Sequence, residues 1–393
     1  MDNPLGFKSL TQHLKHLRFA GVYQLDLKSP KWKIRLHHNY IRFVLCFIML
    51  YTIQQILKVF EVRHDTNKVM ATMFLLLTNT DAFYKQMICW KRADRIEVLL
   101  QTTKDSLFNQ KNPAHKAIHD ANIKAANLNL YIFNAASFCT CFLWSLYPVI
   151  LYIQGNVVEF AIWLPFDANM NTSRFSAVVL YVWVQTTWLA FINTSLDIFI
   201  CYLYGQTTTQ LLILRYNLEH LVQEAKIEAR VSSRSHFQVL DEKLKDAIVH
   251  HQTIVAFSDE VQGIFGGALL YQFTVGSWIY CTSVYRLVEL EPNSIDFITT
   301  FMYLLCILYE IFLYCSSGND VIYQSDKLIE SAYALDWLEM PLKQRRTLLT
   351  FMERVKRPIR PVAGILVVLS NETFVTIVRS SYSLYAFLKN SEK

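Results

Sequence analysis

The sequence predicts an all-α membrane protein with seven transmembrane helices. Of its 393 residues, 53% are hydrophobic and only 18% are charged, and the mean hydropathy is +0.21. A soluble globular domain carries a larger charged fraction, about 25%. Apolar windows of about 20 residues recur along the chain, and a helix of that length crosses a hydrocarbon core of about 30 Å. Composition and window length together place the chain among membrane proteins.

Seven windows have the length and composition of a spanning helix. They are residues 41–57, 69–90, 128–153, 177–204, 264–287, 295–315 and 362–388. The second window contains Asn79, Asp81 and Lys85, and the seventh contains Arg379 among several Ser and Tyr residues. Because polar side chains are costly in hydrocarbon, we expect these two helices to face protein or water rather than lipid.

The distribution of basic residues predicts the orientation of the seven-helix domain, residues 41–388. The N-terminal segment and the second, fourth and sixth loops hold about 28 Lys and Arg residues, whereas the other loops and the tail hold about six. Cytoplasmic loops carry the Lys and Arg excess. We therefore expect a cytoplasmic N-terminus and a short extracellular tail, residues 389–393. A receptor that signals through G proteins would have the opposite orientation.

The N-terminal segment, residues 1–40, predicts an amphipathic helix. Leu10, Leu14 and Leu17 recur at helical spacing, with basic residues between them. Such a helix either lies on the inner leaflet or packs on the cytoplasmic ends of the bundle.

Two long cytoplasmic segments, residues 205–263 and 316–361, have apolar residues at helical spacing with charges between them. We expect them to continue the adjacent spans as helices below the membrane, with a turn at residues 337–341. Amphipathic faces of this kind need partners, so the hypothesis is a helical anchor domain between subunits.

Motifs for catalysis or metal binding are lacking. His115 and His119 stand four residues apart without an HExxH pattern, and we interpret them as a solvated helix face. The eight cysteines lie in or beside apolar spans and have no metal-ligand spacing. We expect no catalytic residue, no metal and no cofactor, and no nucleic-acid partner, because the net charge of +6 belongs to the loops. The sequon at Asn171, in the third loop, is a candidate glycosylation site on the predicted outer side.

Four segments, in this order, identify a family. They are "LPFDANMN", "HHQTIVAFSDEVQGIFGGALLYQF", "FLYCSSGNDVIYQSDKLIESAYALDWLEMP" and "LSNETFVTIVRSSYSLYAFLK". The chain resembles insect odorant receptors over its whole length, most strongly from about Phe257 onward. Gustatory receptors tend to end in a Thr-Tyr pair, five apolar residues and Gln-Phe, which differs from Ser381-Tyr382 followed by Leu388-Lys389 here. The chain also lacks the extended fourth loop of the family's co-receptor, so it resembles a ligand-tuning subunit.

The resemblance implies a channel subunit. Such a subunit assembles with odorant co-receptor subunits into a heterotetrameric, odorant-gated, non-selective cation channel in the plasma membrane of insect olfactory sensory neurons. The assembled channel conducts cations and is surrounded by membrane lipid. The alternatives are a metabotropic receptor and a transporter. A transporter would require paired broken helices and midplane carboxylates, and the spans offer few acidic residues apart from Asp81, Asp197 and Glu310.

The resemblance also implies an odorant pocket in the outer half of the bundle, among the second, third, fourth and sixth spans. Aromatic and Met side chains suit a small volatile, and their number hints at an aromatic or heterocyclic one. Each residue could also be ordinary helix packing. The candidate ligand-binding residues are Met70, Met73, Phe74, Leu77, Cys141, Trp144, Ser145, Tyr147, Tyr181, Gln185, Trp188, Phe297 and Phe301.

The seventh span has two distinct faces at 100° per residue. One carries Thr373, Thr376, Ser380, Ser383 and Phe387, and the other carries Asn371, Val378, Tyr382, Tyr385 and Lys389. Periodicity alone does not decide which face lines a pore. The family's gate lies at positions matching Tyr385 and Lys389, although aliphatic residues are commoner there than Tyr. We therefore expect the pore and gate residues to be Ser381, Tyr382, Tyr385 and Lys389, with the Thr/Ser face packed against neighbouring helices.

Overall fold

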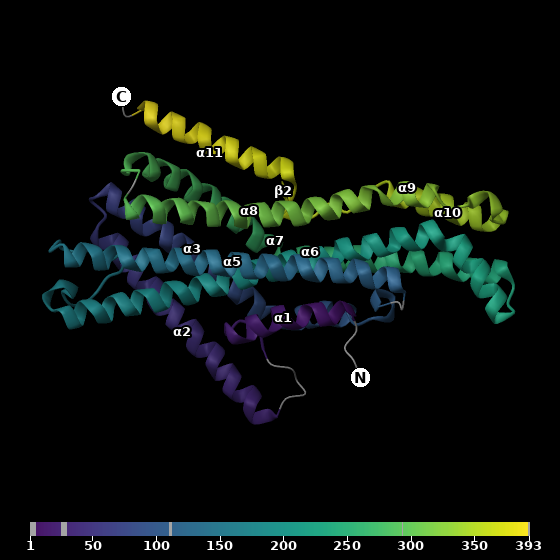
Figure 1. Cartoon of the computed structure of the whole chain (residues 1–393), viewed down its shortest axis with the longest axis horizontal. Coiled ribbons are helices and arrows are strands. Elements are labelled where there is room, and N and C mark those ends of the chain that lie inside the picture. Colours follow the sequence, from purple (N-terminus) through teal and green to yellow (C-terminus); the bar gives the residue numbers. More distant parts are fainter. Residues whose placement is uncertain (1–4, 25–29, 110–111, 293, 392–393) are drawn as a thin grey trace.

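The protein is an elongated helical bundle (Figure 1). The computed structural model describes residues 5–24, 30–109, 112–292 and 294–391. Its long helices are α2 (Lys31–Glu61), α3 (Thr66–Lys91), α5 (Pro113–Ile153), α6 (Thr172–Ser232), α7 (His236–Glu289), α8 (Ile295–Asp326) and α11 (Asn371–Ser391). The shorter elements are α1 (Leu5–Phe19), α4 (Ala93–Thr102), η1 (Ser106–Asn109), η2 (Ala168–Met170), α9 (Leu328–Tyr333), η3 (Trp337–Glu339), α10 (Leu342–Val355), β1 (Val362–Ala363) and β2 (Val367–Val368).

The seven long helices correspond to the seven predicted spans. Among the described residues, four stretches are long and apolar enough to cross a membrane by length and composition: Lys31–Glu61, Pro113–Ile153, Thr172–Ser232 and Ile295–Tyr333. Helix α3 is less apolar because it contains Asn79, Asp81 and Lys85, and all three side chains are buried. The expectation that the polar residues of this helix face protein is confirmed.

Helices α6 and α7 extend well beyond the length that a membrane requires. They have 61 and 54 residues, and they pack along each other. Figure 1 shows their far ends gathered with α9 and α10 at one end of the molecule. Helix α6 ends where Ser233 adopts a left-handed conformation, with φ of 54°. The predicted continuation of these helices, and the turn around Trp337, are confirmed.

Helix α1 packs against the bundle. Leu10, Leu14 and Leu17 are all buried, and α1 contacts α5 and α6. The His13 ring lies 4.8 Å from the ring of Tyr202 on α6. Of the two arrangements that the sequence left open, the structure therefore has the packed helix.

The seventh span begins later than the sequence predicts. Helix α11 starts at Asn371, not near Val362, because a short antiparallel hairpin, β1 paired with β2, precedes it. Gly364 has φ of +62° in the turn, and its amide donates to the Gly266 carbonyl of α7 at 2.7 Å. The Ser370 hydroxyl then accepts from the Thr373 amide at 3.2 Å and caps the helix.

Four histidines of the extended helices are buried. His115 and His119, which we expected on a solvated face, pack inside instead, together with His250 and His251. The reason is that α5 is covered here by α6 and η1: His115 Nε2 lies 2.7 Å from Asn217 Oδ1. His250 Nε2 lies 2.9 Å from Gln210 Oε1. Burial lowers the pKa of His250, and likewise the pKa of His251, to about 4.

These low pKa values predict that acid destabilises the extended helices. In the unfolded chain His250 and His251 bind protons near pH 6.5, whereas in the folded chain they bind them only near pH 4. The stability that the folded state has above pH 6.5 is therefore lost as the pH falls toward 4. We expect the melting temperature of the purified chain to fall between pH 7.5 and pH 5, and to fall less in His250→Gln. The control is His38→Gln at an exposed position. Identical acid sensitivity of all three proteins would contradict this account.

Candidate ligand-binding site

Helices α3, α5, α6 and α8 enclose a cavity of about 110 Å³. Most of its wall is aromatic, aliphatic or sulfur-containing, and one part is polar. The lining residues are Leu75, Thr78, Asn79, Ala82, Phe133, Ser137, Thr140, Cys141, Trp144, Thr186, Leu189, Ala190, Asn193, Thr194, Tyr303, Cys306, Ile307 and Glu310. A mostly apolar cavity between helices with a few placed polar groups is typical of small-molecule sites.

Two aromatic rings of the cavity wall, those of Trp144 and Tyr303, pack on the ring of Phe74. The Phe74 ring lies 5.4 Å from the Trp144 ring and 5.4 Å from the Tyr303 ring. The Tyr303 hydroxyl lies 2.7 Å from Thr78 Oγ1, which fixes the ring against α3. Trp144 and Tyr303 also line a second cavity of about 410 Å³, whose charged residues include Arg286 and Asp296. Trp144 and Tyr303 therefore stand between a mostly apolar inner cavity and an outer one that contains charged residues.

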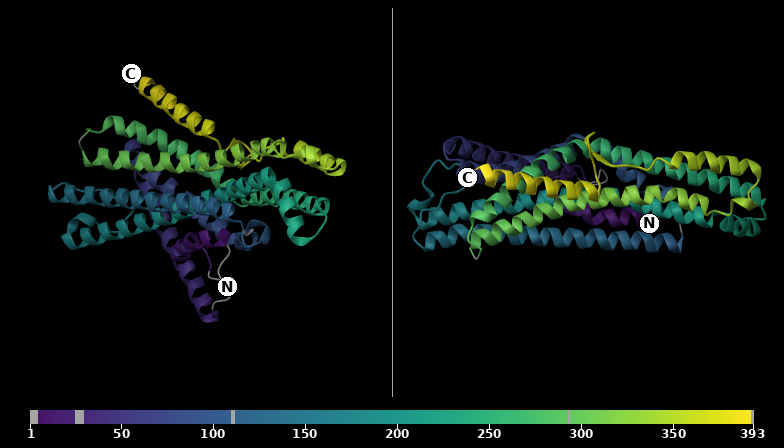
Figure 2. Two further views of the ribbon diagram at one scale, coloured as in Figure 1. Left: turned by 45° about the vertical axis from the view of Figure 1, so that its right-hand side comes forward. Right: turned by 90° about the horizontal axis from the view of Figure 1, so that it is seen from above.

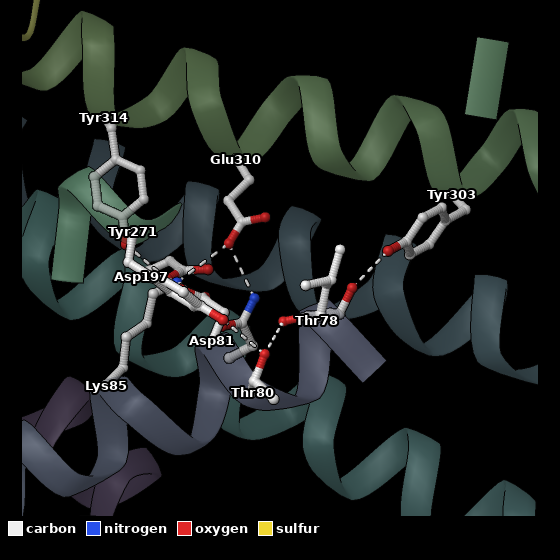
Figure 3. A network of polar contacts seen from close by, with 11 residues as sticks. Thr78, Thr80, Asp81, Lys85, Asp197, Tyr271, Tyr303, Glu310 and Tyr314 are labelled. Atoms are coloured by element: carbon white, nitrogen blue, oxygen red, sulfur yellow. Dashed lines mark hydrogen bonds and ion pairs between the residues drawn. The ribbon is translucent and has the colours of Figure 1, made fainter. Parts of the chain in front are cut away.

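The polar end of the cavity adjoins a buried charge network, shown in Figure 3. Lys85 on α3 is completely buried. Its Nζ lies 2.5 Å from Asp197 Oδ1 on α6, 2.7 Å from Asp81 Oδ2 and 3.4 Å from Glu310 Oε1 on α8. The Tyr314 hydroxyl donates to the same Asp197 oxygen at 2.6 Å.

Asn193 joins this network to the cavity. Its Oδ1 accepts from Lys85 at 3.1 Å, and its Nδ2 donates to Glu310 Oε1 at 2.9 Å. Asn193 and Glu310 both line the cavity. Three carboxyl groups surround one ammonium group, so acceptors outnumber cationic donors at the point where the network meets the cavity.

The structure brings only part of the predicted pocket together. Cys141 and Trp144 line the 110 Å³ cavity. Met70 and Phe74 line the 410 Å³ cavity, and Ser145 and Tyr147 line a third, of about 170 Å³, which also touches Trp144. The lining residues of these three cavities do not include Met73, Leu77, Phe297 or Phe301.

The predicted stripe on α6 faces away from the cavity. The Tyr181 hydroxyl donates to Gln54 on α2 at 2.7 Å, and Gln185 donates to the Phe47 carbonyl of α2 at 3.2 Å. The Trp188 ring packs 5.5 Å from the ring of Phe19 on α1. Tyr181, Gln185 and Trp188 line none of these three cavities, because α1 and α2 cover that face of α6.

Sequence reasoning missed the polar part of the cavity. Glu310, Asn193 and Thr78 line it. From the sequence, Glu310 served only as one of the few acidic residues in the spans, whose small number argued against a transporter. The available signal was the presence of Lys85, Asp197 and Glu310 well inside predicted spans, since an ionisable residue at membrane depth commonly marks a functional site. Among the residues that the structure describes, no cluster of His, Cys, Asp and Glu could hold a metal ion.

The expected pore residues lie on α11, which diverges from the bundle toward its C-terminal end (Figure 1). Its packed face carries Phe374, whose ring lies 5.6 Å from Phe312 on α8, and Ser381, which is 4% exposed. Tyr382 is 66% exposed in the single chain. The side chains of Tyr385 and Lys389 lie outside the described residues.

The hydroxyl stripe of α11 is not the packed face. Thr376, Ser380 and Ser383 are exposed in the single chain, so this stripe does not pack against the helices of the same chain. Their hydroxyls donate to backbone carbonyls four residues earlier in α11. The face that packs on α8 carries the next residue after each of two members of this stripe, Phe374 after Thr373 and Ser381 after Ser380. Its contact with α8 is made by the large apolar side chain of Phe374.

The fold is that of a seven-helix membrane protein with a mostly apolar cavity enclosed between four of its helices. A family model described as "7tm Odorant receptor" matches residues 65–382, so the chain belongs to the odorant receptor family. Odorant receptor Or1 of Anopheles gambiae is 21% identical over 364 residues, which cover 88% of this chain and 86% of that protein. The relatives are receptors, not enzymes.

Solved structures show the same fold. The insect olfactory receptor OR5 from Machilis hrabei superposes with a TM-score of 0.80 at 15% identity, covering 97% of both chains. The same receptor in complex with eugenol superposes with a TM-score of 0.78 at 16% identity, covering 98% of both. The predicted all-α, seven-helix membrane fold is confirmed.

The charge network predicts a large cost for removing Lys85. Lys85→Met leaves three buried carboxyl groups without their cation, and breaking a buried ion pair costs about 3–5 kcal/mol. We expect a much lower melting temperature of the purified chain and little protein at the cell surface. The matched control is Lys68→Met, whose ion pair with Glu159 is half exposed and whose loss should leave the melting temperature unchanged. Equal stability of the two variants would show that the network is dispensable.

Proposed function

We propose that the chain is the odorant-binding subunit of a heteromeric, odorant-gated, non-selective cation channel that also contains co-receptor subunits. The observation that carries the proposal is the cavity enclosed by α3, α5, α6 and α8. The OR5 receptor, which shares the fold, has been solved in complex with eugenol, a small aromatic molecule. By analogy, a small volatile binds in the cavity of this chain, in contact with Cys141 and Trp144.

Helix α8 offers a mechanical link from the cavity to the last helix. Tyr303, Cys306 and Ile307 line the cavity, and Phe312 of the same helix contacts Phe374 of α11. Farther along α8, Gly318 packs so closely on Leu369 that an added Cβ would lie 2.5 Å from the Leu369 carbonyl oxygen. A ligand that prefers one position of α8 thereby shifts the equilibrium of α11 between closed and open positions.

The pore in this proposal is central and lined by α11. The exposure of Tyr382 in the single chain supports placing this face toward neighbouring subunits or ions, with Tyr385 and Lys389 following on the same side of the wheel. The N-terminus and the far ends of α6 and α7 are cytoplasmic, and the C-terminus is extracellular. Asn171, exposed at the start of α6, is then available for glycosylation.

The subunit contacts in this proposal lie at the far ends of α6 and α7. Large apolar side chains there are exposed in the single chain, including Val231, Leu338 and Leu342. Exposed apolar surface of this kind marks an interaction site, which supports a cytoplasmic anchor between subunits. The assembled channel operates in the plasma membrane of olfactory sensory neurons.

The proposal predicts which tryptophan controls odorant sensitivity. In cells that express the chain with a co-receptor, an odorant panel read as current should give responses that Trp144→Ala weakens, raising the half-maximal concentration by roughly tenfold through lost ring contact. Trp188→Ala is the control, because Trp188 faces α1 rather than the cavity.

Both variants are first matched for surface expression. Equal sensitivity of Trp144→Ala and the unmodified chain would refute the cavity as the odorant site. Currents that disappear without intracellular nucleotides would instead favour a metabotropic receptor.

A further inference from the structure

Four hydroxyl groups of the cavity wall already donate their hydrogens within the protein. Four threonines donate to the carbonyl oxygen four residues earlier in their own helix, at 2.8 or 2.9 Å; they are Thr78, Thr140, Thr186 and Thr194. A hydroxyl has one hydrogen and two acceptor lone pairs. Toward the cavity these groups therefore act as acceptors.

The amide groups of the wall are also engaged as donors. Asn79 Nδ2 donates to Gln55 Oε1 at 2.5 Å, and Asn193 Nδ2 donates to Glu310 Oε1. If the Thr78 hydrogen goes to the Phe74 carbonyl, the Tyr303 hydroxyl is the donor in its contact with Thr78. Each amide nitrogen has a second hydrogen, but the four threonine oxygens and the Glu310 carboxyl group give the polar part of the wall more acceptors than free hydrogens.

Glu310 is the strongest of these acceptors. Its Oε1 accepts from Asn193 and pairs with Lys85, which fixes the carboxyl group at the polar end of the cavity. Figure 3 shows the other carboxyl oxygen directed away from these two partners. An oxygen of a carboxyl group has two lone pairs, so this second oxygen can accept a hydrogen bond from a ligand.

We infer that this cavity selects a small, ring-sized odorant that donates a hydrogen bond, such as an alcohol or a phenol, over an equally sized molecule that only accepts one. Glu310 is the residue that determines this specificity. The inference rests on the proposed function, which makes the cavity the odorant site. The size limit follows from the volume: a protein cavity of about 150 Å³ is known to hold benzene, and this one, at about 110 Å³, would have to widen slightly.

Charge and wall composition set further limits on the ligand. The lining residues of the cavity include no Lys or Arg, which disfavours carboxylates, because burying an unpaired charge is costly. Esters, ethers and aldehydes have acceptor atoms but no hydrogen to donate, so the acceptor oxygens of the wall would remain unpaired beside them. Unpaired buried polar groups reduce affinity.

The test uses pairs of compounds that differ in one hydrogen-bond donor. These are 4-methylphenol against 4-methylanisole, and benzyl alcohol against benzaldehyde. Each compound is measured twice: as current from the chain with a co-receptor, and as the rise in melting temperature of the purified full chain. We expect the hydroxyl compound of each pair to act at a concentration roughly ten- to a hundredfold lower.

Glu310→Gln assigns the preference to one residue. The amide has the same shape but replaces one carboxyl oxygen with an NH2 donor, so we expect the preference within each pair to shrink by roughly tenfold, while Asp320→Asn on the same helix leaves it unchanged. Comparing ratios between proteins removes differences in the compounds' own hydrophobicity. If Glu310→Gln does not reach the membrane, the compound pairs on the unmodified chain still decide.

The two readouts separate the inference from the proposed function. Currents with no preference for hydroxyl compounds, or a preference that Glu310→Gln leaves intact, would overturn the inference alone. A hydroxyl-selective rise in melting temperature without any current would overturn the channel function and keep the inference. No rise and no current with any compound would overturn both.

Discussion

The ammonium group of Lys85 holds the membrane bundle together at its centre. Its ion pairs join α3 to α6 through Asp197 and to α8 through Glu310, and a third, with Asp81, lies within α3. A fully buried cation is tolerated only when its partners compensate for lost hydration. The three helices must therefore meet at one depth and one rotation, which a purely apolar interface in lipid would not enforce.

The cavity depends on this network because the two share residues. Lys85 donates a hydrogen bond to Asn193 and forms an ion pair with Glu310, and both residues also line the cavity. Aromatic rings close the opposite side, where Phe74 contacts both Trp144 and Tyr303. A ligand in between would contact the three helices that the network fixes, and through α8 it is connected to α11. If the cavity is the odorant site, as we propose, ligand recognition and stability are properties of the same small region.

The sequence predicted the helices better than their faces. Seven apolar windows predicted the seven long helices. The helical spacing of apolar residues outside those windows predicted that α6 and α7 extend beyond the length that a membrane requires. Periodicity also defined the stripe with Tyr181, but it could not identify α2 as the neighbour that covers it. The partners of Lys85 could not be predicted either, since Asp197 and Glu310 are 112 and 225 residues away. The hairpin before α11 depends on Gly364 and its contact with α7, which is also a tertiary feature.

An experimental structure of the full chain with 4-methylphenol tests the central claim most directly. The account predicts ligand density between Trp144, Tyr303 and Glu310, with the hydroxyl oxygen within hydrogen-bond distance of the Glu310 carboxyl group and Lys85 still paired with Asp197. Ligand in the 410 Å³ outer cavity with the inner cavity collapsed, or Lys85 exposed to lipid or water, would contradict it.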